Sequence, residues 1–134
     1  MASTPEFSSI VRSPQIKLNN ASGTTTQTIF TVLAAKGAIL RALWATSNDT
    51  TSRFITLIKN DGTQDGLVVT MRIPAATTSY PVQIVNFLDP NRLTFLNPYD
   101  IQWHVEQNDV FKAKMETAIT ASAEITVFAQ YGEF

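Results

Sequence analysis

Residues 110–131 read VFKAKMETAITASAEITVFAQY, and apolar side chains recur at every second position in two parts of this stretch. The apolar members are Phe111, Ala113 and Met115 in the first part, and Ala123, Ile125, Val127, Ala129 and Tyr131 in the second. Successive side chains of a β-strand point to opposite faces of a sheet, so each part predicts a strand with one buried face. The polar segment near residues 120–122 predicts a turn between them.

Similar short apolar runs precede this stretch. They cover residues 24–33, 38–47, 53–59, 67–73, 82–87 and 101–106. The sequence Asn60-Asp61-Gly62 is a strong turn signal and predicts a hairpin between the runs 53–59 and 67–73. Strict alternation in the second of these runs predicts one shared face consisting of Leu67, Val69, Met71 and Ile73.

These runs amount to about eight short strands, and none of them shows a sustained helical period. Short strands separated by turns every ten residues or so are typical of a β-sandwich or barrel. Because several strands are apolar on both faces, the pattern favours two packed sheets. We therefore expect an all-β protein, a two-sheet antiparallel β-sandwich of jelly-roll type.

The composition narrows the range of functions. The chain has 134 residues, which is one domain by length, and a net charge of −1. This charge leaves no broad positive surface for phosphate backbones, so we expect no nucleic-acid partner. No apolar run approaches the roughly 20 residues of a membrane-spanning helix, so we expect no membrane partner. Charged residues make up only 16% of the chain, and uncharged polar residues, including 18 threonines, replace them.

Residues for catalysis or metal binding are few. The chain has one histidine, His104, and no cysteine, whereas a zinc site needs several such ligands around one ion. The segment from Asp61 to Arg72 resembles a calcium loop only in part, because Arg72 stands where the bidentate glutamate belongs. We therefore expect no cofactor, no metal site and no enzymatic activity.

Two tryptophans, Trp44 and Trp103, lie in apolar runs. Aromatic rings can stack on sugars, and this leaves a carbohydrate-binding module as one alternative function. Tryptophan in an apolar strand is more often a core residue, which is the interpretation we favour for both.

Residues 1–20 differ from the rest of the chain, since they contain Pro5, Pro14 and little periodicity. We expect residues 1–20 to form an extended N-terminal arm and residues 21–134 to form the sandwich domain; a frayed terminus is the alternative. Four apolar residues in the arm are candidates for contact with a capsid or a neighbouring subunit: Ile10, Val11, Ile16 and Leu18.

Four segments carry a resemblance to a known family. They are RALWATSNDT at 41–50, NFLDP at 86–90, NDVFK at 108–112 and ITVFAQYGEF at 125–134. In order and spacing they are similar to segments of the small capsid decoration (cement) proteins of tailed bacteriophages. The chain departs from the family at Asn108, where the family's turn has glycine.

The resemblance implies a β-sandwich that forms a homotrimer on the outer surface of the phage head. Such proteins are made in the bacterial cytoplasm, bind the major capsid protein and hold neighbouring capsid subunits together against the pressure of packaged DNA. The alternatives are a tail, fibre or head–tail junction component of the virion, or the carbohydrate-binding module.

Overall fold

The structure is a computed structural model, and it describes residues 10–134. Its strands are β1 (Ile10–Arg12), β2 (Gln15–Leu18), β3 (Gln27–Thr31), β4 (Ala38–Ser47), β5 (Arg53–Asn60), β6 (Asp65–Ile73), β7 (Gln83–Asn86), β8 (Trp103–Val105), β9 (Val110–Met115) and β10 (Ile125–Glu133). A short 3-10 helix, η1 (Asn20–Ser22), follows β2. The eight strands predicted from alternation are present as β3 to β10.

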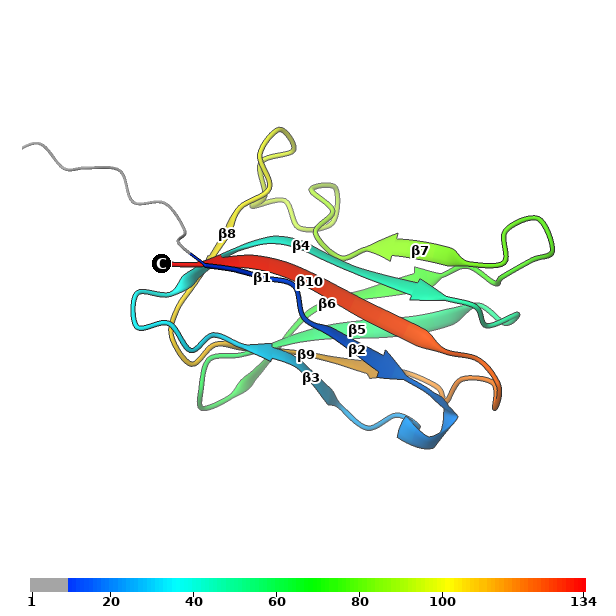
Figure 1. The fold of residues 1–134 in the computed structure, drawn as a ribbon. Coiled ribbons are helices and arrows are strands. Elements are labelled where there is room, and N and C mark those ends of the chain that lie inside the picture. The colour runs from blue at the N-terminus through cyan, green and yellow to red at the C-terminus, as the bar shows by residue number, and fades with distance from the viewer. Residues whose placement is uncertain (1–9) are drawn as a thin grey trace, which may run out of the picture.

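The strands form two antiparallel sheets that pack face to face (Figure 1). Sheet A has the order β1 and β2, then β10, β4, and finally β7 and β8. Sheet B has the order β3, β9, β5, β6. Most connections cross from one sheet to the other, which is the connectivity of a jelly roll. The predicted fold class is therefore confirmed.

Strands β1 and β2 act as one strand position of sheet A. Arg12 lies opposite Tyr131 and Gln15 lies opposite Phe128, so the register along β10 is unbroken between them. Pro14 sits at the interruption, and its carbonyl still accepts a hydrogen bond from the Ala129 N–H at 3.0 Å. Proline is tolerated here because the position lies on an edge strand. Residues 10–18 of the expected arm are thus part of the sheet, while residues 1–9 lie outside the described residues.

Strands β7 and β8 share the opposite edge of sheet A in the same way. β7 pairs with the second half of β4 and β8 pairs with its first three residues. Between them the segment 87–102 leaves the sheet and folds as a series of turns (Figure 1). Leu93 and Leu96 from this segment are buried in the core, so the segment closes this side of the sandwich.

The predicted hairpin is present as β5 and β6, but one of its expected faces is wrong. Met71 and Ile73 point into the core, whereas Leu67 is 77% exposed. The cause is a β-bulge: Leu57 lies opposite Val69, yet Ile58 lies opposite Leu67, so Val68 is an extra residue in β6. One extra residue breaks the alternation, so the side chains before it point to the opposite face from the one that the pattern after it predicts.

Aromatic side chains join the two sheets in the core. Phe30 of sheet B stacks on Tyr131 of sheet A, with ring centroids 4.4 Å apart, and on Phe111 at 5.0 Å. The inward residues predicted for β9 and β10 are all buried, as the alternation required. Such tight interdigitation gives the domain a rigid body.

Candidate functional site

The described residues contain few groups that could perform chemistry. Within residues 10–134 no group of three or more His, Cys, Asp or Glu side chains is placed to hold a metal ion. His104 lies exposed on β8, opposite Ile39 of β4. In the same part of the chain, no helix is long and apolar enough to cross a membrane. The candidates for function that remain are exposed surfaces and the hydrogen-bond networks that stabilise them.

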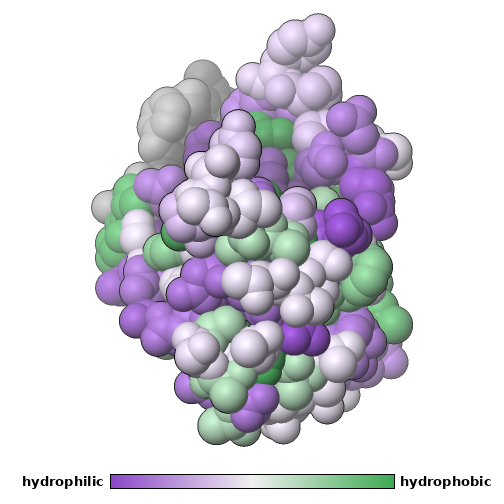
Figure 2. Space-filling model, turned by 90° about the vertical axis from the view of Figure 1, so that its right-hand side faces the viewer, coloured by the Kyte–Doolittle hydropathy of each residue, from purple (hydrophilic) through white to green (hydrophobic). Residues whose placement is uncertain are grey.

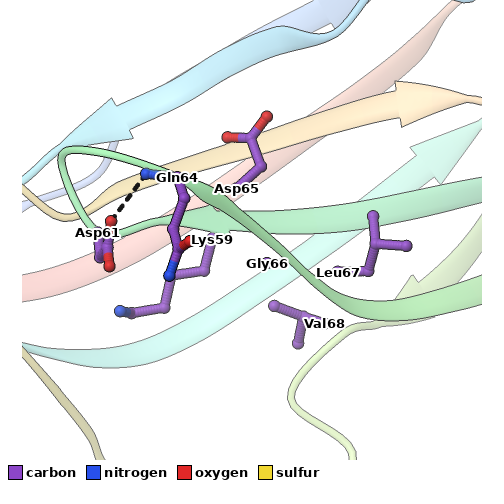
Figure 3. Close-up of a pocket in the computed structure, with 7 residues that line it drawn as sticks. All are labelled: Lys59, Asp61, Gln64, Asp65, Gly66, Leu67 and Val68. Atoms are coloured by element: carbon purple, nitrogen blue, oxygen red, sulfur yellow. Dashed lines mark hydrogen bonds between the residues drawn. The ribbon is translucent and has the colours of Figure 1, made fainter.

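A hollow beside the β5–β6 turn is lined by Lys59, Asp61, Gln64, Asp65, Gly66, Leu67 and Val68 (Figure 3). The Asp61 carboxylate accepts hydrogen bonds from the Thr63 N–H at 3.0 Å, the Thr63 hydroxyl at 2.9 Å and the Gln64 N–H at 2.9 Å. These bonds lower the pKa of Asp61 to about 2. The turn's own donors thus engage one oxygen of this carboxylate, which is the arrangement of an Asx turn.

The four predicted contact residues lie in different environments. Ile10 and Val11 of β1 are 46% and 65% exposed. Ile16 is half-buried against the core, and Leu18 is only 1% exposed within it. The first two present apolar surface to the outside, and the last two hold β2 against the sandwich.

The two tryptophans also differ. Trp103 packs against the core, with its ring edge-on to Phe95 and Phe111 at 5.0 and 5.1 Å. Trp44 lies on the outer face of sheet A and stacks on Phe128, with centroids 5.1 Å apart and the planes 11° from parallel. The expectation of a core position is therefore confirmed for Trp103 and wrong for Trp44. The stack covers one face of each ring, which leaves less open ring surface for a sugar than two separate rings would offer.

A buried carboxylate, which the sequence did not reveal, organises the loop end of the sandwich. Asp49 is fully buried, and its carboxylate accepts hydrogen bonds from Arg53 Nε at 2.8 Å, Thr51 N–H at 2.9 Å and Thr120 Oγ1 at 2.8 Å. The Asp49 carbonyl also accepts the Ala76 N–H at 2.8 Å. Burial by itself raises the pKa of Asp49, but the hydrogen bonds to its carboxylate outweigh this effect and lower the pKa to about 2.

Asp49 therefore fastens the β4–β5, β6–β7 and β9–β10 connections to one another. Figure 2 shows this end of the molecule, where hydrophilic and near-neutral residues predominate and hydrophobic residues form small separate groups. Aspartate is common in turns because its side chain hydrogen-bonds the nearby backbone. The sequence around Asp49 therefore gives no sign of the partners that lie far along the chain.

Comparison with known proteins gives a match in structure but not in sequence. No protein-family profile matches the chain, and no curated protein matches it. A chain in the acidic stable capsid structure of Helicobacter pylori bacteriophage KHP30 matches with a TM-score of 0.60 and 12% identity, over 94% of this chain and 90% of that chain. The two chains share a fold.

Weaker structural matches come from other phage sources. A chain of the cyanophage Pam1 capsid asymmetric unit matches with a TM-score of 0.44 and 16% identity, over 100% of this chain and 92% of that one. A pentameric capsid protein isolated from metagenomic phage sequences matches with a TM-score of 0.42 and 17% identity, over 90% of this chain and 61% of that one.

Proposed function

We propose that this chain is a non-enzymatic structural protein of a phage particle, a decoration (cement) protein that binds the outer surface of the head. The observation that carries the proposal is the whole-length likeness to a chain of a phage capsid structure. Each chain covers nearly all of the other, so the likeness extends over a complete sandwich of similar size and is not limited to a shared submotif.

The physical properties of the chain fit this role. A cement protein needs a rigid body and surfaces that attach, and it needs no reactive group. The jelly roll supplies the body, and several large apolar side chains remain exposed, among them Ile10, Val11, Ile84 and Phe95. Exposed apolar residues of this kind are common at protein interfaces.

We further propose a homotrimer in which Ile10 and Val11, at the start of β1, contact the capsid or a neighbouring subunit. Three linked contacts bind more strongly than one, because the second and third form at high effective concentration. Ile16 and Leu18 assist by holding this segment in sheet A. A variant that lacks residues 1–9 retains the residues of β1 and β2. Its capsid binding therefore tests the first nine residues separately from the edge of sheet A that β1 and β2 form.

Copy number in purified virions tests the role. Quantitative mass spectrometry against the major capsid protein is expected to give a large, fixed fraction of the number of capsid subunits. Protease treatment of intact particles is expected to cut this protein, since the proposal places it on the outer surface. A few copies per particle would instead indicate a tail, fibre or head–tail junction component, and absence from virions would reject a structural role.

A further inference from the structure

The two outer faces of the sandwich differ in charge. The outer face of sheet B consists of side chains that alternate with the core residues of β9, β5 and β6. Five charged residues stand on it: Asp65, Arg72, Lys112, Lys114 and Glu116. Two of them, Lys112 and Asp65, form an ion pair at 3.3 Å. Two large apolar side chains, Phe54 and Leu67, are also exposed on this face, among the charged residues.

The central rows of the outer face of sheet A carry less charge. Cross-strand neighbours form two complete rows on it: Lys17, Thr126, Thr46 and Ile84, and then Gln15, Phe128, Trp44 and Asn86. Gln130 and Ala42 form the start of a third. We refer to these ten residues as the sheet A patch. Its one charged member, Lys17, lies at the edge and pairs with Glu124 at 3.7 Å. Arg41, the extra residue of a bulge in β4, is exposed at the border of the patch beside Ala42 and pairs with Asp100 at 3.7 Å.

The centre of this patch is aromatic. Trp44 and Phe128 stack on each other outside the buried core, and Ile84 beside them is 63% exposed. The centres of protein interfaces are depleted in charge and enriched in aromatic residues, and tryptophan is frequent among the residues that dominate binding. The central rows of sheet A therefore have the composition of an interface core, whereas the exposed apolar residues of sheet B stand among five charged ones.

The size of the face indicates the kind of partner. The sheet A patch covers four strand positions and residues 126–130 of β10, which span about 19 by 17 Å, or roughly 300 Å². A stable pairwise interface buries about 800 Å² on each partner, so this face alone is small for an isolated dimer. A shell with many equivalent positions suits it better, because several weak contacts act together.

Resting on the proposed virion role, we propose that the sheet A patch binds the head shell through an uncharged, apolar surface of the shell protein. Trp44 and Phe128 form the anchor of this contact. Because charged pairs contribute little, raising NaCl from about 0.05 to about 0.5 M is expected to change binding by less than about twofold.

The test measures co-sedimentation of the purified protein with capsids that lack it. Trp44→Ser and Phe128→Ser are expected to weaken binding at least tenfold. Ile84→Ser, which leaves the aromatic stack in place, is expected to weaken it severalfold and serves if the stack variants fail to fold. The matched control is Phe54→Ser, which changes a 50% exposed aromatic residue opposite Arg72 on sheet B and is expected to leave binding unchanged.

The outcomes separate the two proposals. Wild-type affinity for the folded patch variants would overturn the assignment of the patch while leaving the virion role standing. Loss of the wild-type oligomer in those variants, measured by mass photometry, would also overturn it, since the patch would then join copies of this chain. Failure of the wild-type protein itself to bind capsids would reject the proposed function.

Discussion

Asn108 occupies a turn position that is often filled by glycine, and the structure gives the physical reason why asparagine serves there. Among the described residues it is the only non-glycine residue with a positive φ, at 73°. Asparagine adopts this left-handed conformation more readily than most residues do. The turn therefore keeps the shape that glycine would give it.

We expect Asn108→Gly to change the free energy of unfolding by less than about 0.5 kcal/mol, and Asn108→Ala to lower it by about 1–2 kcal/mol, because alanine is strained in the left-handed region. Urea unfolding followed by tryptophan fluorescence measures both. Equal stability of the alanine and wild-type proteins would show that this backbone conformation is not required.

Asp49 predicts how stability depends on pH. Its pKa in the folded protein is about 2, below the ordinary value of 3.8, so its carboxylate stabilises the fold above pH 4. That contribution falls as the pH drops from about 4 through about 2. Asp49→Asn is expected to lower the free energy of unfolding at pH 7 by about 2 kcal/mol, since donors that now bind a carboxylate lose their partner.

Unfolding curves of both proteins at pH 7, 4 and 2.5 check this prediction. The difference between them is expected to shrink towards the lowest pH. Asp61→Asn is the comparison: Asp61 lies in an exposed turn where water competes for its hydrogen bonds, so this substitution is expected to have a smaller effect at each pH. A constant difference across the three pH values would show that the charge of Asp49 is not the source of its effect.

At the scale of elements, β1 and β2 show which parts of the fold the sequence could predict. Inward residues of β9 and β10 follow from alternation, because each strand is long and regular. β1 and β2 are short and interrupted at Pro14, and their partner β10 lies at the other end of the chain. A local sequence pattern does not predict which distant strands pair, and it does not predict the bulge that turns Leu67 outward.

The sheet A patch could not be predicted from the sequence either, because it depends on which strands pair. Because Val127 and Ala129 point inward, alternation predicts that Phe128 points outward, but its neighbour Trp44 comes from a run that is apolar at almost every position. Only the register between β4 and β10 brings the two rings together. A pair of outward aromatic residues on adjacent strands is visible once the strand order is known, and not before.

Leu18 and Val11 test whether this segment is part of the sandwich or a loose arm. Leu18 is 1% exposed, so Leu18→Ala is expected to lower the free energy of unfolding by about 2–5 kcal/mol. Val11 is 65% exposed, and Val11→Ala is expected to have an effect within about 0.5 kcal/mol. Thermal and urea unfolding measure both. A negligible effect of Leu18→Ala would contradict the packing of β2.

For the whole molecule, the proposed trimer predicts a native mass three times the 14.8 kDa of the chain. Native mass spectrometry measures it directly. If β1 lies at the subunit contact, Val11→Asp is expected to shift the protein towards monomers, because a charge would enter an apolar interface. Leu67→Asp, on the far sheet and 77% exposed, is expected to leave the mass unchanged. A monomeric wild-type protein would refute the trimer.

The pairing of Ile10 with Glu133 has a practical consequence for engineering. The start of β1 and the end of β10 lie side by side, away from the connections that Asp49 holds together (Figure 1). Fluorescent proteins or antigens fused ahead of residue 10 or after residue 134 would therefore leave the sandwich from the same end. A fusion at either point would leave the opposite end of the sandwich undisturbed, and two different cargoes would be held close together. Both fusions would also lie beside Ile10 and Val11, so a bulky cargo would obstruct the contact proposed for these residues.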